Sequence, residues 1–243
     1  AFLSKCLYQA YGKKYIILID EYDVPLESSY FSGCYDDMVA FIRSLFGSAL
    51  KTNPYLEFAV VTGCLRVSRE SIFTGLNNLK MCSILDDSYG EYFGFTEQEI
   101  QDMLAAYGRE EKLEETRRWY DGYRFGKAEV YNPWSILNYM DAIATNPKAF
   151  PAPYWANTSS NDIVRSLVER IDDGDGEMKG LLEHLMNGGT IEKPVHEDIT
   201  YDSIYDSEDN LWNFLFFTGY MKKVSMRQEG TKRFLTMAVP NME

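Results

Sequence analysis

The feature that most constrains the fold of this chain is an apolar run that ends in carboxylates. The run Tyr15–Ile19 consists of β-favouring apolar residues, and Asp20 and Glu21 follow it at once. A short apolar run between polar residues is typical of a strand buried on both faces of a parallel sheet, and ligands of such sheets bind at the carboxyl ends of the strands. We therefore expect both acids at a binding edge. The run alone leaves open the alternative of a core strand that enters an acidic loop.

The segment around this run predicts a strand–helix–strand unit. Apolar residues at helical spacing in Asp36–Leu50 precede a second apolar run, Leu56–Val61. The order predicts two parallel strands joined by a right-handed crossover. Phe2–Tyr11 is expected to form a helix before the first strand, and Pro25 is expected to prevent regular structure directly after it.

Polar residues that follow the second strand are candidates for a nucleotide site. Thr62 ends that strand, where a nucleotide hydrolase places a residue that senses the γ-phosphate; the alternative is a Thr that caps a turn. Arg66 and Arg69 come next, either to reach a phosphate of a neighbouring subunit or to pair with nearby acids, and charge alone favours the ion pair. In such enzymes the first acid after the strand, here Asp20, holds the water shell of Mg²⁺, and the next, here Glu21, orients or deprotonates the attacking water.

Several further motifs occur in a fixed order along the chain. They are Thr62-Gly63, Ser68–Leu79, Tyr92–Thr96, Trp119–Gly126, Tyr131–Ser135 and Tyr154–Ser159. Together with Tyr15–Asp23, which is similar to a Walker B strand, they resemble the AAA-ATPase-like family of bacteria and archaea. Members of that family typically carry a PD-(D/E)XK nuclease domain further downstream. The resemblance implies an α/β P-loop NTPase core, ATP and Mg²⁺ as cofactors, Asp20 as the metal residue, and Glu21, Thr62, Arg66 and Arg69 as catalytic residues, the arginines acting in trans in a homo-oligomer.

One departure from the family limits what this chain can do. The pattern G-x-x-x-x-G-K-[ST] is missing, and the Gly-Lys pairs Gly12-Lys13 and Gly126-Lys127 lack the glycines and the hydroxyl that a phosphate cradle needs. In the family the P-loop lies upstream of the Walker B strand, so the chain looks truncated. We expect the full-length parent to hydrolyse ATP and this piece to bind nucleotide weakly and to be inactive. The alternative is a non-enzymatic interaction or regulatory module that retains the ATPase fold.

The sequence predicts three domains: a partial ATPase core over 1–91, a helical lid over 92–158 and a winged-helix-like module over 159–243. Thr96 and Glu99 form a capping box that opens the helix Glu97–Tyr107. Asn132 and Pro133 mark the start of another helix. In the third domain, helices are followed by an alternating hairpin at its end. The predicted fold class is thus α/β, an incomplete P-loop NTPase parallel-sheet core followed by a lid and a winged-helix-like module.

Charge and composition exclude several other classes. With a net charge of −13 and a pI near 4.7, the chain is not expected to bind DNA strongly, although Lys222–Arg233 is locally basic. There is no apolar stretch of membrane-span length and no signal peptide, so a cytoplasmic location and no membrane partner are expected. The four cysteines are widely spaced and are expected to be reduced core thiols. Neither His184 nor His196 lies in a zinc or triad motif.

Overall fold

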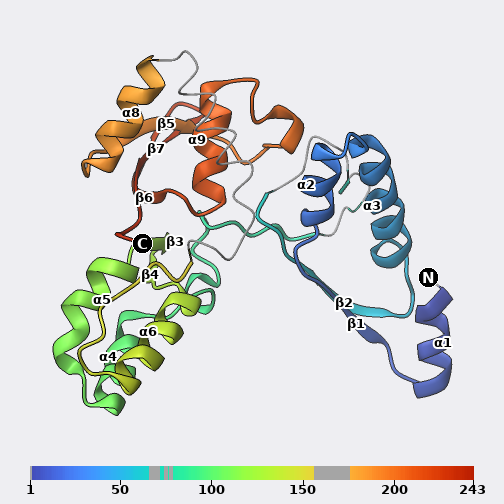
Figure 1. Cartoon of the computed structure of the whole chain (residues 1–243). Helices are drawn as coiled ribbons and strands as arrows, with labels where there is room; N and C mark the ends of the chain where they lie inside the picture. Colours follow the sequence, from blue (N-terminus) through green and yellow to red (C-terminus); the bar gives the residue numbers. More distant parts are fainter. Residues whose placement is uncertain (1, 66–71, 74–75, 77–78, 156–175) are drawn as a thin grey trace. The chain divides into compact units, whose positions relative to one another are not determined.

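The structure is a computed structural model that describes residues 2–65, 72–73, 76, 79–155 and 176–243 (Figure 1). The chain forms two compact units. Unit 1 comprises residues 1–81 and 195–218, and unit 2 comprises residues 82–194 and 219–243. Helices and small sheets alternate along the sequence, so the chain is a mixed α/β protein. The predicted domain boundaries after residues 91 and 158 stay predictions.

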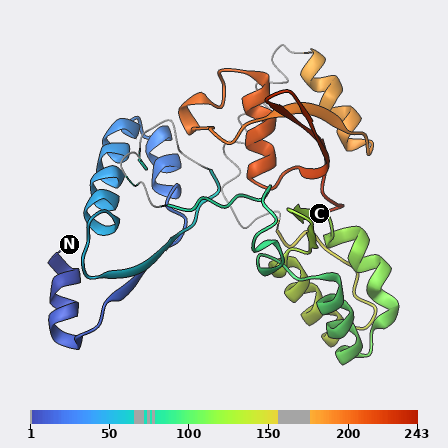
Figure 2. The same cartoon turned by 180° about the vertical axis from the view of Figure 1, so that it is seen from behind.

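The predicted strand–helix–strand arrangement is confirmed in unit 1. Helix α1 (Phe2–Tyr11) precedes strand β1 (Tyr15–Ile19), and helix α3 (Tyr35–Leu50) leads to strand β2 (Leu56–Val61). The two strands pair in parallel, with Ile19 opposite Val61, and they run side by side in both views (Figures 1 and 2). The carboxyl ends of both strands therefore meet at one edge.

The prediction that β1 is buried on both faces is wrong. Ile16 and Leu18 are 60% and 74% exposed, and on β2 Phe58 and Val60 are 59% and 40% exposed. These side chains alternate with less exposed ones, as period-2 strand geometry requires, so one apolar face of the sheet is open. The physical reason is packing, because among the described residues nothing covers this face of the two-stranded sheet.

A helix that the sequence did not predict begins directly after the acidic segment. Helix α2 (Val24–Phe31) carries Pro25 in its first turn. Proline is tolerated there because the first turn has no intrahelical acceptor for its missing N–H. The carbonyl of Asp23 accepts hydrogen bonds from the N–H groups of Leu26 (2.9 Å) and Glu27 (3.0 Å) and so starts the helix. Pro25 therefore begins regular structure here, contrary to the prediction.

Unit 1 also contains a segment from late in the sequence. It includes the short 3-10 helix η3 (Tyr201–Ser203) and helix α9 (Glu208–Phe217). Helix η3 contacts α2. Helix α9 begins at Ser207, whose side chain accepts a hydrogen bond from the Asn210 N–H, and it buries Trp212 completely. Residues distant in sequence from the acidic segment thus complete the unit that holds it.

Unit 2 begins with the helical region that the sequence predicted. Its elements are η1 (Gly90–Tyr92), α4 (Glu97–Tyr107), η2 (Glu110–Lys112), α5 (Leu113–Tyr120), β3 (Tyr123–Phe125), β4 (Ala128–Val130) and α6 (Pro133–Thr145). The capping box of Thr96 and Glu99 is confirmed, and so is Asn132 as the N-cap of α6. Both local hydrogen-bonding patterns could be read from the sequence because they involve residues only three positions apart.

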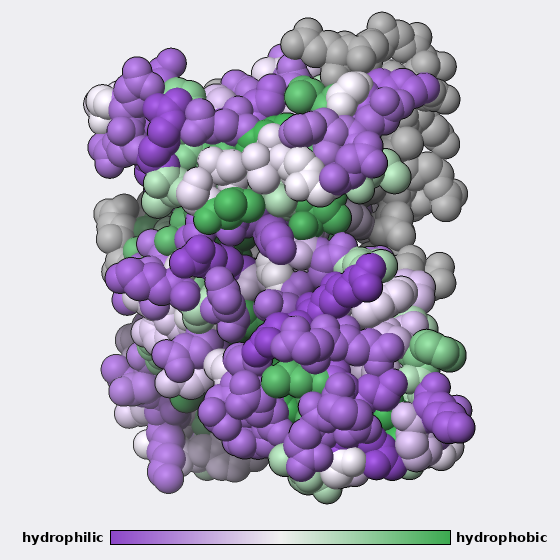
Figure 3. All heavy atoms as spheres, turned by 90° about the vertical axis from the view of Figure 1, so that its left-hand side faces the viewer, coloured by the Kyte–Doolittle hydropathy of each residue, from purple (hydrophilic) through white to green (hydrophobic). Residues whose placement is uncertain are grey.

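The remaining elements of unit 2 form a second helix-and-sheet region. Helix α8 (Gly176–Met186) is followed by β5 (Ile191–Val195), β6 (Lys222–Glu229) and β7 (Lys232–Ala238), and the strands are arranged in the order β5-β7-β6. The predicted hairpin is confirmed, with β6 and β7 antiparallel. Figure 3 shows one face of the molecule on which hydrophilic residues predominate and hydrophobic ones form small separate areas. Among the described residues, no helix combines the length and apolar content that a membrane span requires.

Candidate functional site

The ends of the two parallel strands bring three of the predicted site residues together. Asp20 and Glu21 follow β1, and Thr62 follows β2. The Thr62 hydroxyl donates a hydrogen bond to the Asp20 carboxylate, and the Glu21 N–H donates to the same hydroxyl oxygen at 3.2 Å. The Thr62 N–H donates to the Ile19 carbonyl at 2.9 Å and so continues the strand pairing. One hydroxyl therefore links the Asp20 carboxylate to the main chain of Glu21.

Glu21 has an unusual backbone conformation. Its φ of +49° lies in the left-handed region, which is uncommon for a residue other than glycine, asparagine or aspartate. Such conformations cost about 1–3 kcal/mol and are concentrated at functional sites. Both Asp20 and Glu21 are solvent-exposed, so their carboxylates are accessible to a ligand. The strained backbone at Glu21 therefore marks this turn as a candidate functional position.

The third carboxylate of the segment has a different environment. Asp23 is only 1% exposed. One of its carboxylate oxygens accepts hydrogen bonds from the Leu65 N–H at 2.8 Å and from the Tyr201 hydroxyl at 3.4 Å. Burial raises the pKa of Asp23 above its ordinary value, while the backbone N–H groups of Leu65 and Cys64 oppose that rise. The sequence analysis did not select Asp23; the available signal was a carboxylate that falls between apolar residues.

Tyr22 holds the segment after β2 from the other side. Its N–H donates to the Thr62 carbonyl at 2.9 Å, and its hydroxyl donates to the Leu65 carbonyl at 2.5 Å. A Cβ atom added to Gly63 would lie 2.6 Å from the Tyr22 ring and 2.7 Å from an Asp23 carboxylate oxygen. Residues 62–65 are therefore fixed by hydrogen bonds at both ends and by close packing in the middle.

The predicted arginines cannot be placed in this site. Arg66 and Arg69 lie outside the described residues, and their roles stay predictions.

The oxygen atoms at this edge fit one of the ways in which proteins bind Mg²⁺. The described residues contain no cluster of three or more histidine, cysteine, aspartate or glutamate side chains that could hold a metal ion. Mg²⁺ at nucleotide sites is commonly held by one or two carboxylates together with phosphate oxygens and water rather than by a protein cage. The Asp20 carboxylate and the Thr62 hydroxyl fit this second mode.

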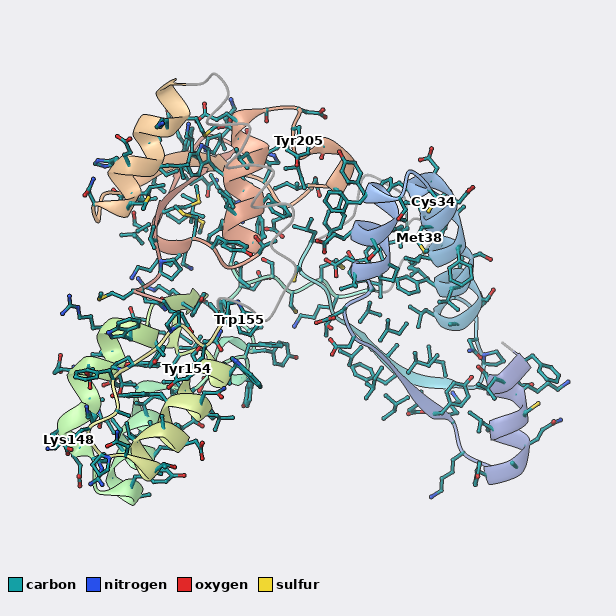
Figure 4. The ribbon with its side chains drawn as sticks, in the orientation of Figure 1. Cys34, Met38, Lys148, Tyr154, Trp155 and Tyr205 are labelled. Atoms are coloured by element: carbon teal, nitrogen blue, oxygen red, sulfur yellow. The ribbon has the colours of Figure 1, made fainter. Side chains whose placement is uncertain are left out.

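Some aromatic residues of unit 2 form its core, whereas others, such as Tyr92 and Phe93, are exposed. Tyr120 and Tyr131 are buried among the apolar residues of α4 and α6. The Tyr131 hydroxyl donates to Glu97, whose carboxylate also pairs with Arg117. Trp134 is half exposed, and its indole N–H donates to the carbonyl of Tyr154 at 3.1 Å; Figure 4 shows Tyr154 next to Trp155.

The basic cluster 222–233 is largely paired within unit 2. Arg227 forms a bidentate ion pair with Glu192, at 2.8 and 2.9 Å, contacts Glu229, and lies over the Phe234 ring at 4.3 Å from its centroid. The Lys222 ammonium donates to the Pro240 carbonyl at 2.7 Å. These contacts reduce the positive charge that the cluster offers to phosphate.

The prediction that the four cysteines are core residues is wrong for three of them. All four are free thiols, and Cys34, Cys64 and Cys82 are exposed. Figure 4 shows Cys34 near Met38, where α3 begins. The apolar neighbours in the sequence were misleading because burial of one residue in a turn does not extend to the next: Leu65 is buried, whereas the adjacent Cys64 is exposed.

The residues at the strand ends lie within a segment that matches a known family model. Residues 1–73 match the family model described as "Predicted AAA-ATPase". A relative from Azotobacter chroococcum mcd 1, named "Uncharacterized protein in vnfD 5'region", is 24% identical over 242 residues; the match covers 99% of this chain and 43% of the relative. The chain therefore spans less than half the length of that relative. No solved structure matches the chain. Over its N-terminal residues 1–73, the chain is therefore similar to the AAA-ATPase-like family.

Proposed function

We propose that the full-length protein hydrolyses ATP and that unit 1 supplies the acidic side of its nucleotide site. The observation that carries this proposal is the hydrogen bond between Thr62 and Asp20, which joins the carboxyl ends of neighbouring parallel strands. Ligands of parallel sheets bind at this edge. The segment that contains these residues also matches the "Predicted AAA-ATPase" model.

In this proposal each residue has a separate role. Asp20 would hold the water shell of Mg²⁺ bound to the nucleotide, and Thr62 would sense the γ-phosphate. When bound, the ion would neutralise charge on the phosphates. Glu21 orients the attacking water or accepts its proton, for which its exposed carboxylate and its proximity to Thr62 are suited. Arg66 and Arg69 would act on the nucleotide of a neighbouring subunit in a homo-oligomer.

The open face of β1 and β2 supports a further layer packed on this sheet in the complete ATPase core. Parallel sheets occur almost only with both faces covered, and here four apolar side chains of one face are at least 40% exposed. We propose that the described strands are one part of a P-loop NTPase sheet, to which a helical lid (92–158) and a winged-helix-like module (159–243) are appended. A downstream nuclease domain would follow in the longer protein, at a cytoplasmic location.

The proposal is tested with carboxylate variants of the full-length protein. Glu21→Gln is expected to lower the rate of phosphate release by about 10²–10⁴-fold, the usual contribution of a general base, while nucleotide stays bound. Asp20→Asn is expected to weaken Mg²⁺-dependent nucleotide binding as well. The matched control is Glu57→Gln, the same chemical change at an exposed position on β2, which should leave hydrolysis unchanged. Full turnover by Glu21→Gln would remove Glu21 from the mechanism.

A second candidate function is a non-enzymatic interaction or regulatory module. It is favoured by the missing P-loop pattern among the 243 residues, because a backbone cradle and its lysine supply much of the affinity for phosphates. Titration calorimetry of the 243-residue chain with Mg²⁺-ATP is expected to show weak binding under both candidates. The full-length protein separates them: measurable hydrolysis supports the ATPase, and its lack supports the module.

A further inference from the structure

A buried carboxylate next to the candidate site has no role in the mechanism above. Asp23 is 1% exposed, and burying a charged group without partners is costly. Its partners come from two parts of unit 1 that are far apart in sequence. The Leu65 N–H belongs to the turn after β2, and the Tyr201 hydroxyl belongs to η3, 178 positions away from Asp23. The carboxylate is therefore a junction between these elements and α2.

We propose that Asp23 is a positioning residue that holds Thr62 beside Asp20 and Glu21, and that Tyr201 links it to residues 195–218. This inference rests on the proposed ATPase function for its catalytic consequence. The Leu65 N–H is fixed by Asp23, and the Leu65 carbonyl is fixed by the neighbouring residue Tyr22. With both polar groups of Leu65 held, the short stretch from Thr62 to Leu65 has little freedom to move.

Packing transmits the same constraint to Gly63. The close approach of an Asp23 carboxylate oxygen and the Tyr22 ring leaves no room for a side chain at Gly63. Thr62 precedes this residue, and its hydroxyl joins the Asp20 carboxylate to the backbone N–H of Glu21. A shift of Asp23 would move the turn and change the distance between the Thr62 hydroxyl and the acids.

Through Tyr201, residues 195–218 contact the Asp23 carboxylate directly. Tyr201 is 3% exposed, so its hydroxyl has little access to water as an alternative partner. The short helix that contains it packs on α2, whose first turn is started by the Asp23 carbonyl. Movement of residues 195–218 would therefore displace Asp23 first and, through it, Thr62.

The test is amide hydrogen exchange of the 243-residue chain, measured on peptides that contain Leu65. Tyr201→Phe removes only the hydroxyl. We expect the Leu65 amide to exchange about tenfold faster, equivalent to about 1.4 kcal/mol. The variant removes the hydrogen bond from the Tyr201 hydroxyl to the Asp23 carboxylate, and the length of this bond keeps the expected effect moderate. The matched control is Tyr15→Phe, which removes a hydroxyl bonded to Asn53 at the opposite end of β1 and should leave Leu65 unchanged.

A second variant and a second readout keep the proposal falsifiable. Asp23→Asn is expected to accelerate exchange at Leu65 more than Tyr201→Phe does; if it unfolds the chain, exchange in α3 will report this and Tyr201→Phe decides. In the full-length protein, Tyr201→Phe is expected to lower kcat for ATP by about tenfold with KM unchanged. The rate is calculated per active site, so a smaller amount of folded enzyme would not lower kcat. Unchanged exchange at Leu65 in Tyr201→Phe would overturn the inference. A wild-type protein without hydrolysis would refute the proposed function but leave the exchange result decisive.

Discussion

Replacing Gly63 by alanine is expected to destabilise unit 1 through a steric clash. The added Cβ would lie 2.6 Å from two carbon atoms of the Tyr22 ring, whereas carbon atoms in favourable contact are about 3.5–4.0 Å apart. Gly63 is not among the glycines with positive φ, so the backbone conformation itself does not require glycine. The expected effect therefore comes from packing alone.

The magnitude follows from how firmly the ring is held. The Tyr22 hydroxyl is bonded to the Leu65 carbonyl, and its ring packs on Phe46 and Phe73 at centroid distances of 6.0 and 5.3 Å. A ring fixed on three sides cannot move away by the required distance without displacing its neighbours. Overpacking of this kind costs about 1–3 kcal/mol, and we expect a value near the middle, about 2 kcal/mol.

The assay is native-state hydrogen exchange over a series of urea concentrations, read on peptides from β1, β2 and α3. A loss of about 2 kcal/mol corresponds to about 30-fold faster exchange of globally protected amides. Gly47→Ala is the matched control: Gly47 lies within α3, and a Cβ there meets nothing within 4 Å. Alanine in a helix interior is favoured over glycine by about 1 kcal/mol, so the control should slow exchange. If Gly63→Ala is as protected as the wild type, the packing argument for residues 62–65 is wrong.

Two further predictions concern α4 in unit 2. Thr96→Ala removes the side chain that caps the helix and is expected to lower the free energy of unfolding of unit 2 by about 1 kcal/mol, as measured by exchange in α4, whereas Thr96→Ser should retain most of it. Burial raises the pKa of Glu97, but hydrogen bonds from Tyr131 and Arg117 outweigh this and hold it below its ordinary value of 4.5. Because the folded-state pKa is depressed, the stabilisation is present above about pH 4.5 and is lost as the pH falls through the lower folded-state value; acid titration of unit 2 stability should lose this component in Glu97→Gln.

Local sequence patterns predicted much of the secondary structure. The apolar runs gave both strands of unit 1 with their observed bounds, and the Thr96–Glu99 pair gave the start of α4. These features depend on interactions between residues a few positions apart, so a short stretch of sequence is enough to predict them. Parallel pairing of β1 and β2 also followed, because a helix lies between them.

Features that depend on distant residues were not predicted. An apolar run does not reveal whether both faces of its sheet are covered, so the exposure of Leu18 and Phe58 was not predicted. Pro25 lies two positions after the N-cap residue Asp23, a place that suits a first helical turn, so it does not prevent regular structure there. In the candidate site, the meeting of Asp20, Glu21 and Thr62 follows from strand order alone, whereas the partnership of Asp23 with Tyr201 follows from no local pattern.

The separation of Asp23 from Tyr201 has a consequence for the synthesis of the protein. Ribosomes add on the order of 5–20 residues per second, so the 178 positions between these residues correspond to a delay on the order of ten to forty seconds. During this interval the nascent N-terminal part cannot shield the carboxylate with its final partner. All of the first stretch of unit 2 emerges from the ribosome before unit 1 can close. A pause or early termination in that window would expose an unfinished core to chaperones and proteases.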